Sequence, residues 1–169
     1  ELKDKDNVKV VLMDLSETYR SICKKHFPHA KIVSDRFHVI RLVNHHFLKA
    51  WQILDPEGRK NRGLLSLMRR HEGNLDPIQK QRLMRYLDSV PGLRIVWEFK
   101  QRLCMLLLIK RQTKRECKKL LPFYLKYVQE LKESPFEPLK TLGMTLESWS
   151  KEIVRMWRFT KSNGITEGF

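Results

Sequence analysis

Two short apolar segments of this chain each end on an aspartate, and carboxylates placed in this way can hold a divalent metal ion. The first segment, residues 8–13, ends on Asp14, and the second, residues 31–34, ends on Asp35. Their β-branched residues predict buried strands, and neighbouring parallel strands of α/β proteins open at their carboxyl ends onto a common site. Asp14 is therefore a candidate metal ligand. The alternative is that it only caps a helix or shapes a turn.

A second group of side chains with metal-binding chemistry surrounds Asp35. Asp35 and His38 are three residues apart and share a helical face, so they either ligate one metal or orient each other. The alternative is that Asp35 is a helix N-cap beside an ordinary histidine. Cys23, His26, His29 and His38 also have the residue types of a zinc site. A structural zinc site normally has two closely spaced ligand pairs, which disfavours zinc here.

The elements that must position these residues are one βαβ unit followed by helices. Apolar residues recur at helical spacing between the two strands, and Pro28 ends that helix. The strands are expected to be parallel, with a right-handed crossover. After Asp35, which can serve as an N-cap, the spacing predicts helices over residues 36–54, 62–70, 77–90, 93–110, 113–132 and 138–160. The predicted fold class is an α/β start with a mostly α remainder.

The composition favours a nucleic-acid partner. The 169 residues include 34 Lys and Arg against 19 Asp and Glu, a formal charge of +15 that attracts polyanions. An anionic membrane surface is the second candidate partner, and a solvated basic surface without a ligand is the third reading. Basic clusters predict DNA contacts at Arg36, Arg41, Arg69, Arg70, Arg158 and Lys161.

The cysteines and apolar runs indicate the compartment. Three widely spaced cysteines without a Cys-x-x-Cys pair predict reduced thiols in a cytoplasmic protein. The longest apolar run, residues 103–109, is too short to cross a bilayer, and the charged amino terminus is not a signal peptide. No segment is therefore expected to cross a membrane. With nucleic acid as the favoured partner, we expect neither a membrane nor a small-molecule substrate as a partner.

The last eight residues differ in character from the rest of the chain. Asn163 and Gly164 are typical of a turn, and Thr166 with Glu167 is typical of the first turn of a helix. From pattern alone, a frayed terminus is the preferred interpretation of this segment.

Three segments together resemble one known family. They are residues 13–19, the stretch FPHAKIVSDRFHV at 27–39, and the stretch SNGITEGF at 162–169. In this order they are similar to motifs of the DDE transposases of bacterial insertion sequences, specifically the ISL-three family. The motifs cover the two ends of the chain, and the residues between them match in helical character.

The resemblance implies a ribonuclease H-like core in which three carboxylates hold two Mg²⁺ ions for DNA cleavage and strand transfer. It implies that Asp14 is the second catalytic acid and metal ligand and Glu167 the third. The first acid is then expected upstream of residue 1. A competing triad consists of Asp14, Asp35 and Glu167, but we prefer to place Asp35 beside the site. His38 is then expected to contact DNA or to orient a carboxylate, and Asn163 to contact DNA.

The same resemblance implies a division of the chain and a set of partners. Residues 1–50 would be the second half of the core, residues 51–150 a helical insertion, and residues 151–169 the start of the final core helix. The partners would be insertion-sequence ends and target DNA in a bacterial cytoplasm, with a homo-oligomer assembled on DNA. Lacking the first acid, this fragment is expected to be inactive alone. The alternatives are a non-catalytic basic nucleic-acid-binding protein and a decayed transposase that only binds DNA.

Overall fold

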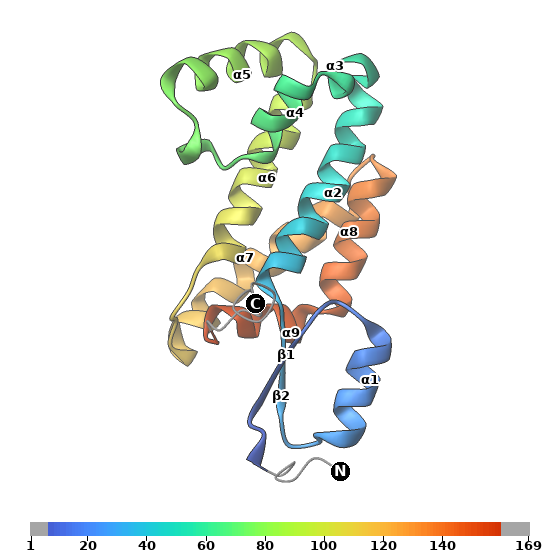
Figure 1. The fold of residues 1–169 in the computed structure, drawn as a ribbon, viewed down its shortest axis with the longest axis vertical. Coiled ribbons are helices and arrows are strands. Elements are labelled where there is room, and N and C mark those ends of the chain that lie inside the picture. The colour runs from blue at the N-terminus through green and yellow to red at the C-terminus, as the bar shows by residue number, and fades with distance from the viewer. Residues whose placement is uncertain (1–6, 160–169) are drawn as a thin grey trace.

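The computed structural model describes residues 7–159, in which a small βαβ unit joins a taller stack of helices (Figure 1). Within this range the sheet consists of β1 (Val10–Met13) and β2 (Lys31–Ser34), paired in parallel with Met13 opposite Ser34. Helix α1 (Glu17–His26) connects the two strands, and its first turn is capped by the Ser16 hydroxyl. The predicted α/β start is therefore confirmed.

The remainder of the described chain is helical, as predicted. Asp35 is the N-cap of α2 and accepts a hydrogen bond from the backbone N–H of Phe37 at 2.7 Å. Asp76 followed by Pro77 is a sequence signal for a helix start, and in the structure Asp76 is the N-cap of α5. Gln79 completes a capping box with it. The helices are α2 (Arg36–Leu54), α3 (Pro56–Lys60), α4 (Arg62–Arg69), α5 (Pro77–Ser89), α6 (Leu93–Leu108), α7 (Lys114–Lys132), α8 (Glu137–Ser148) and α9 (Ser150–Val154), with 3-10 turns η2 (Glu72–Asn74) and η3 (Arg155–Trp157). No helix in residues 7–159 has the length and apolarity that crossing a membrane requires.

The single helix predicted over residues 138–160 is wrong, because the chain turns at Trp149 between α8 and α9. The Ser150 hydroxyl donates to the carbonyls of Leu146 at 3.0 Å and Glu147 at 2.7 Å. Such hydroxyl contacts compete with the regular helical ladder and bend it. The Arg20 guanidinium stacks on the Trp149 ring at 4.1 Å, which fixes α1 against this turn.

Two hydrophobic cores stabilise the molecule, and α2 contributes to both. The larger core joins β2 and the first half of α2 to α6, α7, α8 and α9. The smaller core surrounds Trp51, near the end of α2, and includes residues of α4, α5 and α6. The Trp51 indole N–H donates to the Tyr86 hydroxyl at 2.6 Å, and that hydroxyl donates to Asp55 at 2.7 Å. Helix α6 also contributes to both cores, so α2 and α6 together connect the βαβ unit to the far helices.

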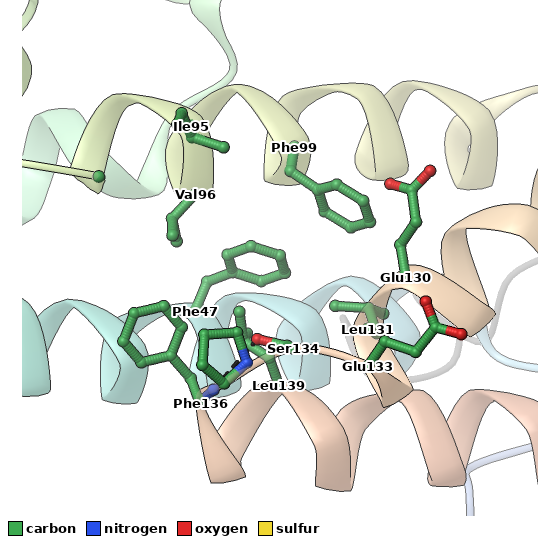
Figure 2. Close-up of a pocket in the computed structure, with 12 residues that line it drawn as sticks. Phe47, Ile95, Val96, Phe99, Glu130, Leu131, Glu133, Ser134, Phe136 and Leu139 are labelled. Atoms are coloured by element: carbon green, nitrogen blue, oxygen red, sulfur yellow. Dashed lines mark hydrogen bonds between the residues drawn. The ribbon is translucent and has the colours of Figure 1, made fainter.

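An apolar cleft of about 410 Å³ lies between α2, α6 and the turn that joins α7 to α8. Figure 2 shows Phe47 and Phe99 inside it, with the carboxylates of Glu130 and Glu133 near one end. The two aromatic rings are stacked with centroids 6.2 Å apart. The cleft offers apolar walls and negative charge, which do not suit a nucleic-acid backbone.

Lys100 is a buried cation on α6, with 5% of its surface exposed. Its ammonium group donates to the carbonyls of Met68 at 2.5 Å and Arg69 at 3.3 Å, at the end of α4. These carbonyls are at the negative end of the helix dipole and favour a cation. Burial has the larger effect and lowers the pKa of Lys100 to about 8.

We predict that Lys100 makes stability depend on pH in the alkaline range. Because its pKa is lower in the folded protein, the unfolded chain binds more protons between pH 8 and 10.5, and the Lys100 contribution to stability rises across this window. Urea unfolding of the wild type and of Lys100→Met tests this. The wild-type free energy of unfolding minus that of the variant should increase by about 3 kcal/mol from pH 7.5 to pH 10.5. A difference that stays constant with pH would contradict the prediction. Lys119→Met, which removes an exposed lysine, is the control.

Candidate metal centre

The two strand-end aspartates lie at the same edge of the sheet. Met13 pairs with Ser34, and the ladder continues to a hydrogen bond from the Asp35 backbone N–H to the Met13 carbonyl at 2.7 Å. Asp14 and Asp35 therefore leave the sheet side by side. Their surroundings differ, since the Asp14 side chain is 48% exposed and the Asp35 side chain is 3% exposed.

His38 closes the group from the first turn of α2. Its Nδ1 atom lies 2.7 Å from Oδ1 of Asp14 and 3.9 Å from Oδ1 of Asp35. Potential ligand atoms of all three residues lie within 4.8 Å of one another. Nδ1 is buried and, despite its short distance from Asp14, has no partner in hydrogen-bond geometry among the described residues. The three side chains thus converge without satisfying Nδ1.

The convergence fits a divalent cation. Two carboxylates supply the hard oxygen ligands that Mg²⁺ prefers, while an imidazole nitrogen suits Mn²⁺ and other transition metals better. A cation near the ligand atoms would also compensate the negative charge of two adjacent carboxylates. Within residues 7–159, Asp14, Asp35 and His38 converge in this way, whereas Cys23, His26 and His29 do not form a zinc-binding cluster.

The structure thus places both residues of this sequence prediction, Asp35 and His38, in one cluster with Asp14. Asp35 is the helix N-cap that one reading proposed, and it also lies within the candidate metal cluster that the other reading proposed. The sequence motifs instead indicated Asp14 and Glu167 as the two metal ligands of this chain. Glu167 lies outside the described residues, as do Lys161 and Asn163.

Arg36 has a different environment from the one expected for a DNA contact. Its guanidinium group donates to the carbonyls of Leu107 at 3.2 Å, Ile109 at 3.0 Å and Met156 at 2.5 Å. Burial lowers the pKa of Arg36, and the neighbouring Asp35 carboxylate partly offsets that effect. Arg36 therefore joins α2 to the end of α6 and to η3, and its N–H groups point at protein backbone.

Of the other predicted DNA contacts in the described range, Arg41, Arg69, Arg70 and Arg158 are exposed, whereas the His38 side chain is 24% exposed and faces Asp14. Arg41 lies on α2 and, with Asp14, His38 and His45, lines a hollow of about 280 Å³. Arg158 follows η3, and its guanidinium lies 5.6 Å from the Phe159 ring. His45 was not among the functional residues predicted from the sequence. Its spacing from His38 and Arg41, at seven and four residues, places it on the same helical face and was the available signal.

Comparison with known proteins agrees with the motifs. The family model for DDE transposases of the ISL-three type, described as a transposase, matches residues 1–169. No curated protein and no solved structure matches the chain. Membership in a transposase family implies a protein that binds and cleaves DNA and uses divalent metal. The match spans the whole sequence, and the chain therefore belongs to the ISL-three family of transposases.

Proposed function

We propose that Asp14 is a metal-binding carboxylate of a ribonuclease H-like site that cleaves DNA at insertion-sequence ends and joins those ends to target DNA. The observation that carries this proposal is the convergence of Asp14, Asp35 and His38 at the carboxyl end of β1. Glu167, outside the described residues, is proposed as a further ligand on the basis of its motif. The bound ions, proposed as Mg²⁺, would activate the attacking oxygen and stabilise the leaving one.

Each residue of the cluster has a distinct proposed role. Asp14 is half exposed, so a cation bound to it would be open to a substrate phosphate. Asp35 is buried and fixed by the backbone N–H of Phe37, so it adds negative charge at a constant position. His38 lies within contact distance of the Asp14 carboxylate and orients it, which is the usual role of a polar neighbour of a metal ligand.

The division of the chain expected from the sequence becomes part of this proposal. Residues 1–50 would belong to the catalytic core, residues 51–150 to a helical insertion, and residues 151–169 to the return into the core. Helix α2 continues through residue 50 to Leu54, so the insertion would begin at the turn into α3. Val10 is 37% exposed, and within residues 7–159 one edge of β1 has no neighbouring strand. This open edge supports a further strand that carries the first acid.

Binding of Mn²⁺ to this chain tests the metal site directly. Electron paramagnetic resonance of free Mn²⁺ should show one bound ion, and Asp14→Asn should weaken its binding by at least about tenfold, because a carboxylate ligand is lost. Asp88→Asn is the matched control, since it makes the same chemical change at a side chain that is 54% exposed on α5. Equal Mn²⁺ affinity in the wild type and Asp14→Asn would refute the assignment of Asp14 as a ligand.

A further inference from the structure

A groove of about 430 Å³ runs along α2 beside the candidate metal centre. Its walls are Phe37, Ile40, Arg41, Asn44, His45 and Leu48 of α2, with Arg69 from the end of α4. Arg41 and His45 also line the hollow that contains Asp14 and His38. The groove and the candidate metal centre therefore share two walls, and a chain molecule leaving the centre would enter the groove.

The lining of the groove suits single-stranded nucleic acid. Phe37 is 61% exposed, and its ring meets the His38 ring edge-on with centroids 5.4 Å apart. Arg41 and Arg69 are exposed, and the groove-lining residues that the structure describes include no carboxylate. Sites for single strands combine a positive groove with an aromatic ring on which a base stacks.

Asn44 provides an independent polar feature in the same groove. Its Oδ1 atom is buried and has no hydrogen-bond partner among the described residues. A buried acceptor without a partner is costly, and a rotation of the Asn44 side chain toward the groove would let a ligand donor relieve that cost. The exocyclic amino group of a nucleobase is such a donor, whereas a phosphate has no hydrogen to donate.

We propose that this groove binds unpaired nucleotides of the DNA strand next to the metal centre, with one base stacked on Phe37 and phosphates held by Arg41 and Arg69. The inference rests on the proposed function, because it takes DNA cleavage as the event at the centre. A fully paired duplex presents its phosphates and buries its base faces, so it uses neither Phe37 nor Asn44. The lining from Phe37 to Leu48 spans about 16 Å of helix, which is room for a few nucleotides.

Metal-free binding of hairpin DNA tests the groove separately from catalysis. Fluorescence anisotropy in EDTA compares a blunt hairpin with one that carries a short unpaired tail. We expect the wild type to prefer the tailed hairpin, and Phe37→Ala to reduce that preference by about fivefold or more. Phe123→Ala is the matched control, since Phe123 is 58% exposed on α7 and lies outside the groove. Equal loss in both variants, or no tail preference in the wild type, would overturn the proposal.

A Phe37→Trp variant distinguishes stacking from phosphate binding. The four native tryptophans, Trp51, Trp97, Trp149 and Trp157, are all buried. An indole at position 37 is therefore the exposed tryptophan whose fluorescence reports on the groove. We expect a tailed hairpin to quench its fluorescence, and a tail of abasic sites to bind without that quenching. Equal quenching by both tails would show phosphate binding alone and reject the stacked base. The two proposals can fail separately. If Asp14→Asn binds Mn²⁺ as tightly as the wild type while both hairpin results are as expected, the assignment of Asp14 as a metal ligand is wrong and the proposed groove function stands.

Discussion

Replacing Asp14 by asparagine is expected to lower the rate of metal-dependent DNA cleavage by the complete transposase at least about a thousandfold. A metal ion contributes several kcal/mol to stabilising the transition state, and about 4 kcal/mol corresponds to that factor. The variant loses a carboxylate charge at the point where Asp14 Oδ1 meets His38 Nδ1 at 2.7 Å. Gel analysis of single-turnover cleavage of an insertion-sequence end, with Mg²⁺ and then with Mn²⁺, measures the loss. Asp88→Asn should retain its rate.

DNA binding by the same variant separates the enzyme from a non-catalytic basic protein. Affinity is set mainly by phosphate contacts and by the +15 charge, so Asp14→Asn and Glu167→Ala should bind DNA with nearly unchanged salt dependence. If cleavage survives both substitutions, the proposed site is wrong and the binding-protein alternative gains support. Robust cleavage by residues 1–169 alone would instead make Asp35 a member of the catalytic triad.

Replacing Arg36 by alanine is expected to lower the free energy of unfolding by about 4 kcal/mol, without a specific defect in DNA binding. The guanidinium donates to three carbonyls in two segments, Leu107 and Ile109 at the end of α6 and Met156 in η3. Each hydrogen bond to a charged group contributes about 1.5–3 kcal/mol, and truncation leaves partly buried carbonyls without a donor. Urea unfolding monitored by circular dichroism measures the change. Arg36→Lys should recover part of it, because one ammonium cannot reproduce the planar fork of donors.

Arg41→Ala is the matched control for this prediction. Arg41 is an exposed arginine on the same helix, so its loss should leave the free energy of unfolding within about 0.5 kcal/mol. It should instead weaken DNA binding and reduce the salt slope by about one. If Arg36→Ala and Arg41→Ala change the salt slope equally and leave stability unchanged, Arg36 is a DNA contact, as the sequence analysis predicted.

The local elements could be predicted from sequence because their signals are local. Strands ending on Asp14 and Asp35, the N-caps Asp35 and Asp76, and the proline after α1 all act within a few residues. The turn at Trp149 could not be predicted in the same way. Besides the local hydrogen bonds of the Ser150 hydroxyl, it involves Arg20, which is more than a hundred residues away and donates to the Ser148 carbonyl at 3.0 Å. The helical pattern of residues 138–160 contains no trace of that contact.

The residues of the candidate site could be predicted from the sequence, but the contacts between them could not. The positions of Asp14, Asp35 and His38 follow from strand ends and helical spacing, but the 2.7 Å approach of His38 to Asp14 depends on the angle at which α2 leaves β2. The basic character of Arg36 indicated a phosphate contact. Its burial between α6 and η3 is a tertiary property, and sequence pattern cannot distinguish a solvated arginine from one that binds backbone carbonyls.

Helix α2 also has a mechanical consequence. It begins beside Asp35 and His38 and, 19 residues later, ends next to Trp51 in the second core, a length of about 28 Å. It runs from the carboxyl ends of the strands to the far end of the helical stack without a proline or glycine (Figure 1). A rod of that length works as a lever, so a tilt of about 5° at one end displaces the other by about 2.5 Å. Force applied to α3, α4 or α5 is thereby transmitted to the carboxylates with a long moment arm.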